Sequence, residues 1–153
     1  MQQSTTPTPS SSFTFTVLGK PAPQGSKRHV GRGVMVESSK RCKPWRQDVR
    51  HTALDLRPED WYANMDAAIS ISVVFVFARP KNHFRTNGQL KPSAPTYCTA
   101  RIGDVDKLAR SILDSLAGVL FAADEQVINL IAQKRYANDR EQPCAIITVA
   151  AVS

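Results

Sequence analysis

The most strand-like part of this 153-residue chain is residues 67–78, which read Ala67-Ala68-Ile69-Ser70-Ile71-Ser72-Val73-Val74-Phe75-Val76-Phe77-Ala78. The first half alternates apolar and small polar residues, a pattern typical of a strand with one buried face. The second half is apolar without interruption, which indicates burial on both faces. We therefore predict that this stretch forms the central strand of a sheet.

Weaker strand patterns flank this stretch on both sides. They cover residues 13–18, 34–36, 126–136 and 144–152. Between the last two, Asn138-Asp139-Arg140 has the composition of a turn. With two helices between the strands, the order of elements predicts an α+β fold with a small sheet, mixed or largely antiparallel.

The first predicted helix spans residues 41–54 and precedes the central strand. Ser38 or Ser39 is a suitable N-cap for it. Apolar residues recur at helical spacing on the side expected to face the core: Trp45, Val49 and Ala53. We interpret both tryptophans, Trp45 and Trp61, as core residues, because tryptophan is more often a core anchor than a platform for stacking bases.

Composition bounds the domain organisation and the compartment. Residues 1–12 are rich in Ser, Thr, Pro and Gln and have neither the basic start nor the apolar middle of a signal peptide. We predict a disordered tail over residues 1–12 and one domain over residues 13–153. No apolar run reaches the length of a membrane span, and the three cysteines contain no CxxC pair. We therefore expect a cytoplasmic protein that does not contact a membrane.

An acidic motif follows the central strand. It reads Asp104-Val105-Asp106-Lys107-Leu108-Ala109-Arg110 and continues, one helix later, as Asp124-Glu125-Gln126-Val127. Side chains two residues apart point to the same side only where the backbone is extended. We therefore predict a second helix that begins near Lys107, with Asp106 as its N-cap, and ends at Gly118. Arg110 would then lie one turn past Asp106, where acids and cations together could surround a divalent metal and a phosphate.

Each motif residue also has a plain structural interpretation. Asp106 could serve only as a helix cap. Arg110 and Asp114 form an i,i+4 pair of the kind that is usually a weak surface salt bridge. Asp124 is a common residue in turns, and Gln126 suits the edge of a strand. The functional interpretation rests on the ordered set and not on any one member.

The net charge of +7 is concentrated in two tracts. Residues 19–50 contain nine Lys/Arg and two acidic residues, and residues 79–103 contain five Lys/Arg and none. Two basic tracts around an acidic centre suit a polyanion such as DNA, although solvated basic loops are common on proteins that bind none. From these tracts we predict six DNA-binding residues: Lys20, Lys27, Arg28, Arg32, Lys81 and Arg85. Residues 79–103 have no apolar periodicity, so we expect them to be mobile without DNA.

The acidic motif resembles that of the RusA-type Holliday junction resolvases, endonucleases that cut four-way DNA junctions. The family pattern is Asp-x-Asp-[Asn/Lys]-x-x-[Lys/Arg], a short helix ending near Asp-x-Leu, and then Asp-Asp-x-Gln-Val. Its counterparts here are residues 104–110, 114–116 and 124–127. Members from phages and prophages share the basic, proline-rich segment after the first strand and a Lys-Arg-Tyr like that at residues 134–136. Three departures are Ala123 in place of an acid, Lys107 for Asn and Arg110 for Lys.

The resemblance implies a RusA-like fold and a metal-dependent endonuclease that resolves junctions in DNA recombination and repair. It makes Asp104, Asp106 and Asp124 the metal ligands and catalytic acids, with Mg²⁺ as cofactor or Mn²⁺ as an alternative. Arg110 would stabilise phosphate charge, because arginine does not deprotonate at ordinary pH. DNA contacts are further implied for Lys107, Lys134 and Arg135. Glu125 remains an alternative to Asp124, since the acidic pair is shifted by one residue.

Two symmetric cuts imply a C2 homodimer. The resemblance also favours a phage or prophage origin within a bacterial host. Two other functions stay open: a Mg²⁺ nuclease that acts on other branched or single-stranded DNA, and a non-catalytic DNA-binding protein in which Ala123 marks the loss of an acid.

Overall fold

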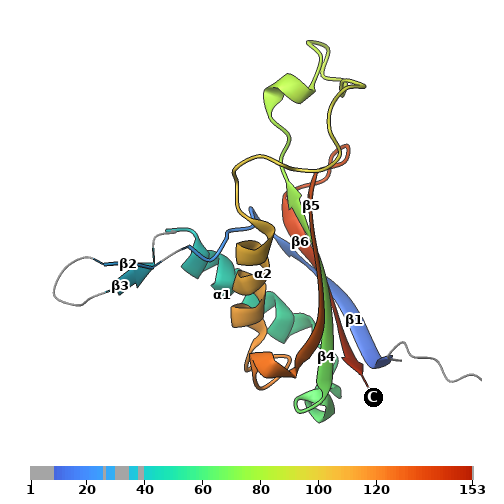
Figure 1. Ribbon diagram of the computed structural model, residues 1–153. Helices are drawn as coiled ribbons and strands as arrows, with labels where there is room; N and C mark the ends of the chain where they lie inside the picture. Colours follow the sequence, from blue (N-terminus) through green and yellow to red (C-terminus); the bar gives the residue numbers. More distant parts are fainter. Residues whose placement is uncertain (1–8, 26, 30–34, 38–39, 153) are drawn as a thin grey trace, which may run out of the picture.

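Four long strands form one sheet, and both helices pack on one of its faces (Figure 1). The computed structural model describes residues 9–25, 27–29, 35–37 and 40–152. The strands are β1 (Pro9–Leu18), β2 (Lys27–His29), β3 (Met35–Glu37), β4 (Ala68–Phe77), β5 (Val127–Tyr136) and β6 (Cys144–Val152). The helices are α1 (Cys42–Leu56) and α2 (Val105–Leu116), with 3-10 turns η1 (Trp61–Asn64), η2 (Lys81–His83) and η3 (Asp124–Gln126).

The sheet is mixed, with strand order β1-β6-β4-β5. β6 pairs antiparallel with both β1 and β4, whereas β5 runs parallel to β4. β2 and β3 form a separate antiparallel hairpin. The predictions of an α+β fold with two helices, a small mixed sheet and an internal strand at residues 67–78 are confirmed.

The core lies between the sheet and the two helices. Alternate residues of β4 from Ile69 to Phe77 are fully buried there, while the second face carries Ser70 and Ser72. Near the end of β4 the alternation stops, because Val76 is buried on the other face against Ala137 and Cys144. Burial of both faces at this end was predicted from the apolar run.

The two tryptophans are core residues, as predicted. Trp45 belongs to the inward row of α1 with Val49 and Ala53. Trp61 is fully buried, and its indole Nε1–H donates to the carbonyl oxygen of Leu120 at 2.9 Å. This bond ties η1 to the chain that follows α2, because a buried indole N–H needs an acceptor.

Helix boundaries differ from the predictions at both N-termini. α1 has Arg41 as its N-cap, without a side-chain cap bond, and extends to Leu56. α2 begins at Val105 and not near Lys107, so its N-cap is Asp104. The apolar residues of α2 were sufficient to locate the helix but not its first turn. Its end was predicted correctly: Ala117 is the C-cap, and Gly118 has the positive φ of +84° that favours glycine.

Residues 9–12, which were predicted to belong to a disordered tail, form the start of a strand. Residues 9–12 belong to β1, because Ser11 and Ser12 pair with Ala151 and Ala150 of β6. Small polar residues suggest disorder in isolation, but an available edge on β6 supplies their backbone hydrogen bonds. Residues 1–8 lie outside the described residues. Neither described α-helix is long and apolar enough to cross a bilayer, and all three cysteines are buried and free.

Residues 79–103 project beyond the end of the sheet (Figure 1) but are attached to it at several points. Cys98 is buried in the main core, and its N–H donates to Lys134 at 3.4 Å. Arg79 donates to the carbonyl oxygens of Ala137 at 2.8 Å and Pro95 at 2.7 Å, and its guanidinium lies over the ring of Tyr136. The absence of apolar periodicity did not predict these attachments, and the mobility of the segment without DNA stays a prediction.

We predict that Arg79→Ala releases this segment from the end of β5. The substitution leaves the carbonyls of Ala137 and Pro95 without their donor, so the free energy of unfolding should fall by about 1–3 kcal/mol. Hydrogen exchange should quicken across residues 79–103 while the amides of β4 stay protected. Lys81→Ala is the control, since that side chain is exposed; equal exchange in both variants would show that Arg79 does not anchor the segment.

Candidate functional site

The acidic motif lies at the N-terminal end of α2. Asp104 has extended backbone angles, φ −72° and ψ 142°, whereas Asp106 lies inside the first helical turn. The predicted convergence through an extended Asp104–Asp106 pair is therefore wrong, because only Asp104 precedes the helix. Both side chains are exposed, and Asp106 is favoured where it lies by the positive end of the helix dipole.

Neighbouring segments hold the start of α2 in place. Gly103 has φ +139°, and a Cβ at this position would lie 3.2 Å from the Leu108 side chain and 3.3 Å from Pro23. Glycine is therefore required both by the backbone angle and by the close approach. The Lys134 ammonium donates to the Gly103 carbonyl oxygen at 2.8 Å, which connects β5 to the residue before Asp104.

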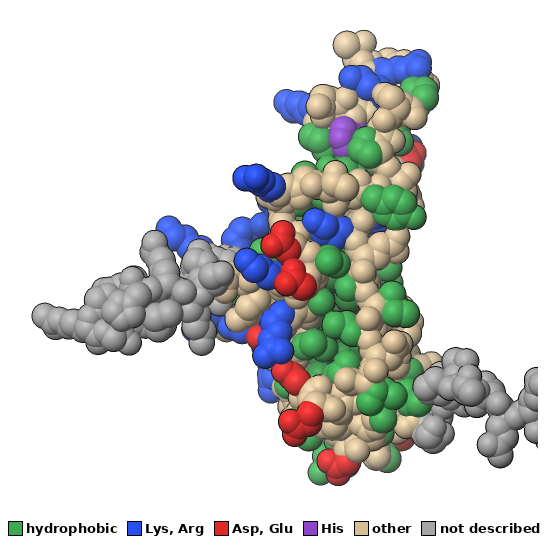
Figure 2. Space-filling view, viewed as in Figure 1, with side chains coloured by type: hydrophobic (Ala, Val, Ile, Leu, Met, Phe, Trp, Pro, Cys, Tyr) green, Lys and Arg blue, Asp and Glu red, His purple; other side chains and the backbone are tan. Residues whose placement is uncertain are grey.

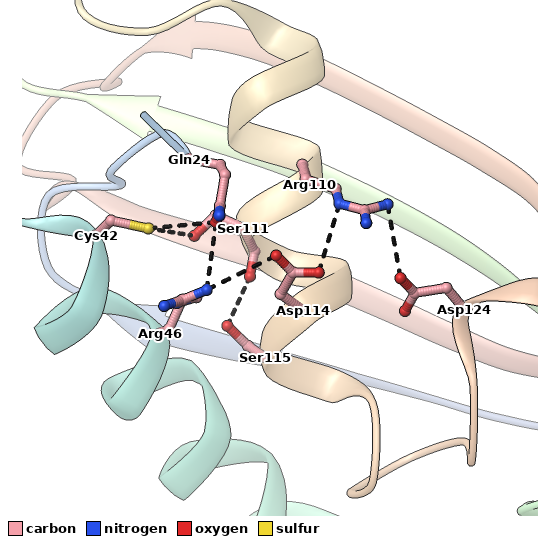
Figure 3. A network of polar contacts seen from close by, with 8 residues as sticks. All are labelled: Gln24, Cys42, Arg46, Arg110, Ser111, Asp114, Ser115 and Asp124. Carbon is pink, nitrogen blue, oxygen red and sulfur yellow. Dashed lines mark hydrogen bonds and ion pairs between the residues drawn. The ribbon is translucent and has the colours of Figure 1, made fainter. Parts of the chain in front are cut away.

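Arg110 lies between two carboxylates on the polar face of α2 (Figure 3). Its Nε is 3.5 Å from Asp114 Oδ1, and its Nη1 is 3.6 Å from Asp124 Oδ2. The first contact is the i,i+4 pair expected from the sequence. The second joins α2 to η3, so residues 14 positions apart in the chain meet at one guanidinium. Because the Arg110 side chain is 57% exposed, each ion pair stabilises the fold only slightly.

The same network extends to α1 and to the loop after β1 (Figure 3). Arg46 Nη1 is 3.7 Å from Asp114 Oδ2 and donates to Gln24 Oε1 at 3.4 Å. Each carboxylate oxygen of Asp114 therefore contacts a different arginine. The contact with Arg46 helps to orient the carboxylate toward Arg110. The motif residues alone do not suggest Arg46 or Gln24, because neither is near the motif in sequence.

Asp124 has one oxygen with no partner. Its Oδ1 is buried and accepts no hydrogen bond from any described residue, while Oδ2 faces Arg110. A buried carboxylate oxygen without a donor is costly, and a cation is the ligand that would satisfy it. Hard carboxylate oxygens are also the donors that Mg²⁺ prefers. Asp124 therefore fits the role of a metal ligand.

The three predicted metal ligands are not gathered around one point. Across the described residues, no three His, Cys, Asp or Glu side chains form a group that could hold a metal ion. What the structure brings together is Asp124 with Arg110 and Asp114. Asp104 and Asp106 lie at the start of the same helix, and Glu125 is exposed beside Asp124.

Gln126 positions the turn that carries Asp124. Its side-chain Oε1 accepts from the N–H groups of Ala122 and Ala123, both at 2.8 Å. Its Nε2 donates to the carbonyl oxygens of Met65 at 2.7 Å and Ala67 at 2.9 Å. Two of these four hydrogen bonds thus close the turn at the start of η3, and the other two connect η3 to the residues before β4. Gln126 is part of the sequence motif, but the sequence alone suggested only a polar residue at the edge of a strand.

The predicted DNA-binding residues fall into three groups. Lys20, Lys81, Arg85 and Lys107 are exposed. Lys134 and Arg135 are partly buried and engaged within the chain, Lys134 with Gly103 and Arg135 with Glu141 at 2.6 and 2.9 Å. The guanidinium of Arg135 holds the pKa of Glu141 at about 2. The side chains of Lys27 and Arg28 in β2, and all of Arg32, lie outside what the structure describes.

Lys and Arg side chains gather on the side of the molecule that carries α2, and Asp and Glu side chains interrupt them there (Figure 2). Lys and Arg side chains continue from this side onto the projecting segment of residues 79–103. This distribution matches the predicted arrangement of a basic surface around an acidic centre.

Comparison with known proteins connects this site to one family. The model of the family described as Endodeoxyribonuclease RusA matches residues 19–149. That range includes both helices, the acidic motif, η3 and all of β4 and β5. A search of curated proteins finds no match.

We predict that Gln126→Glu displaces Asp124 while leaving the rest of the fold intact. The substitution keeps the shape of the side chain but replaces two donors by a charge beside the carbonyl oxygens of Met65 and Ala67. The free energy of unfolding in urea should fall by about 1–3 kcal/mol. Gln133→Glu makes the same change at an exposed position of β5 and should have almost no effect. If the two variants were equally stable, Gln126 would not anchor η3.

Proposed function

We propose a function from one premise: this chain belongs to the endodeoxyribonuclease RusA family, because the family model matches residues 19–149. Members of that family are endodeoxyribonucleases, and the chain is accordingly a DNA nuclease of this type. The proposed activity is resolution of Holliday junctions by paired, symmetric hydrolysis of phosphodiester bonds during recombination and repair. The observation that carries it is the contact of Arg110 with Asp124, which joins the two halves of the acidic motif.

Binding would come mainly from phosphate contacts on the basic side of the molecule. Exposed cations are available at Lys20, Lys81, Arg85 and Lys107. Contacts to phosphates position a protein on DNA without reading its sequence, which suits a nuclease that recognises the shape of a junction. Because Lys134 and Arg135 are engaged within the chain, we propose that they hold the site's framework in addition to contacting DNA.

Asp104, Asp106 and Asp124 are the proposed ligands of Mg²⁺, with Mn²⁺ as a substitute. The metal would supply an activated water and charge stabilisation at the phosphate. The unpartnered Oδ1 of Asp124 supports this assignment, as does the carboxylate chemistry of all three. Glu125, exposed beside Asp124, is the proposed reserve ligand.

Arg110 would act on the phosphate and not as an acid or base, because its guanidinium stays charged at ordinary pH. Without DNA it is 3.6 Å from Asp124 and partly neutralises that carboxylate. Its ion pairs are exposed and weak, so a phosphate can replace the carboxylates as the partner of the guanidinium at little cost in free energy. Asp114 and Arg46 would keep Arg110 on this side of α2 throughout.

A homodimer would provide two active sites, one for each of the two cuts. β5 is an edge strand, and residues 96–98 pair only with its C-terminal end. Its first part exposes Ile128, Leu130 and Ile131, which are 56%, 41% and 58% exposed. An open edge with apolar side chains is suited to pairing with a second copy of itself about a two-fold axis. Since η3 immediately precedes β5, antiparallel pairing about this axis would leave one copy of Asp124 beyond each end of the paired segment, with one site for each cut.

A non-catalytic DNA-binding protein is the second candidate function. It is favoured by two observations: the three acids do not form a metal-holding group within the described residues, and Ala123 replaces an acid of the family pattern. Incubating the protein with a labelled synthetic four-way junction separates the candidates. A nuclease yields symmetric cuts when Mg²⁺ is added, whereas a binder retards the junction and leaves it whole. Cleavage of other branched or single-stranded DNA in preference to the junction would identify the remaining alternative.

We expect Asp104→Asn, Asp106→Asn and Asp124→Asn each to abolish junction cleavage. Removing a carboxylate deletes a proposed metal ligand, while the lower negative charge should leave junction binding unchanged or tighter. Cleavage is read on denaturing gels and binding by gel shift in EDTA. Glu59→Gln is the control, because Glu59 is an exposed acid that lies outside the motif in sequence.

The result for Glu125→Gln distinguishes the two acids of η3. If Glu125→Gln were inactive and Asp124→Asn active, the metal ligand would be Glu125. Normal cleavage by any one of the three Asp→Asn variants would remove that residue from the site.

We predict that Ile131→Lys converts a dimer into a monomer. A lysine at the open edge would place a charge in the proposed interface, and edge lysines oppose strand pairing. Sedimentation analysis of the wild type should give the mass of two chains. Leu56→Lys tests a side chain of similar exposure, 55%, at the end of α1 and should leave the dimer intact. A monomeric wild type, or a dimeric Ile131→Lys, would exclude this edge as the interface.

A further inference from the structure

A cavity lies at the end of β5 opposite to Asp124. Its volume is about 460 Å³, and it is partly open to solvent. One wall comes from the projecting segment, with Phe84 and Leu90, and the other from the turn between β5 and β6, with Asn138 and Arg140. Ten residues of β5 separate this cavity from η3, so it is distinct from the site around Arg110.

Both walls are held in place by hydrogen bonds within the chain. Arg79 fastens the projecting segment through its bonds to Ala137 and Pro95. The turn is closed by Glu141, which accepts from Arg135 and from the N–H of Asn138 at 2.9 Å. The cavity is therefore built before any ligand arrives, and binding need not order its walls.

The lining has the chemistry of a site for a flat, neutral ligand. Phe84 and Leu90 are 38% and 45% exposed and offer an apolar surface, as do the alanines at positions 78 and 137. Gln89 and Asn138 offer amide donors and acceptors at the rim. Charges are balanced, since the lining contains Asp139 and Glu141 as well as Arg79 and Arg140. A phosphate would meet two carboxylates here, and the Arg79 guanidinium is already engaged.

Arg140 supplies a second, independent feature of the turn. It is the one residue other than glycine with a positive φ, +62°, in the described part of the chain. A left-handed arginine costs free energy, and residues held in this way are concentrated at binding sites. Arg140 is also one of the residues that line the cavity.

Exposed cations lie near the cavity. The segment that forms its first wall carries the exposed cations Lys81 and Arg85, and cations continue from there to α2 (Figure 2). We propose that the cavity binds a single unpaired nucleobase, stacked on Phe84 and hydrogen-bonded at the rim, while the neighbouring cations hold its phosphates. An unpaired base at a branch point costs least to unstack, which makes branched DNA its source.

This inference rests on the proposed function only in taking DNA as the ligand, so its test avoids the junction. The probe is a duplex with one bulged base, compared in EDTA with the fully paired duplex of the same sequence. The wild type should bind the bulged duplex about tenfold more tightly, in the range that base–aromatic stacking provides. Phe84→Ala should lose that preference. Tyr97→Ala is the matched control, because Tyr97 is an exposed aromatic residue of the same segment outside the lining and should retain it.

Two further measurements keep the test independent of folding and of cleavage. Arg140→Gly relieves the positive φ, so it should weaken bulge preference severalfold without lowering the melting temperature. A photoreactive 5-iodouracil at the bulge should crosslink to residues 84–90 or 137–141 in the wild type. Equal affinity of the wild type for both duplexes, or a crosslink elsewhere, would overturn the inference. Tighter binding of the bulged duplex without cleavage of a four-way junction would contradict the proposed function and still support the nucleobase site.

Discussion

The parallel pairing of β5 with β4 is the constraint on which the rest of the structure depends. Two parallel neighbours cannot be joined by a tight turn, so the chain between Phe77 and Val127 must return along the whole length of the sheet. It does so through the projecting segment and α2. As a result, Asp124 lies at the start of β5, and the proposed base site lies at its end.

The amphipathic character of α2 then decides what each face presents. Leu108, Ile112 and Leu116 are fully buried against the sheet, which leaves Arg110 and Asp114 on the outer face. Because the helix cannot rotate without exposing that apolar row, Arg110 is held on the side where η3 arrives. The ion pair with Asp124 is thus a consequence of packing and contributes little to stability itself.

The site combines weak polar contacts with a rigid framework. The ion pairs of Arg110 and Arg46 are at the long end of the range, 3.5 to 3.7 Å, and are partly exposed. The short hydrogen bonds are those that hold the backbone, made by Gln126 and Lys134. This division suits a nuclease, because the groups that meet the phosphate can change partners while the segments that carry them stay in place.

A basic, proline-containing stretch can still be attached to the core, as the projecting segment shows. Its composition has no periodicity, yet Cys98 and Arg79 join it to the sheet at points far apart in the chain. A single buried residue and a single multivalent side chain are invisible to pattern analysis, which depends on repetition. Their effect is to convert a long connection into one wall of a cavity.

The sequence by itself determined the fold class, the internal strand at residues 67–78, the inward row of α1 and the end of α2, because each depends on local periodicity or on glycine at a positive φ. It also assigned the motif to its family. Only the tertiary structure decided that Asp104 and not Asp106 caps α2, that Gln126 anchors η3, and that Asp124 meets Arg110. Those facts depend on contacts between segments that are distant in sequence, where the available partner and not the local pattern selects the conformation.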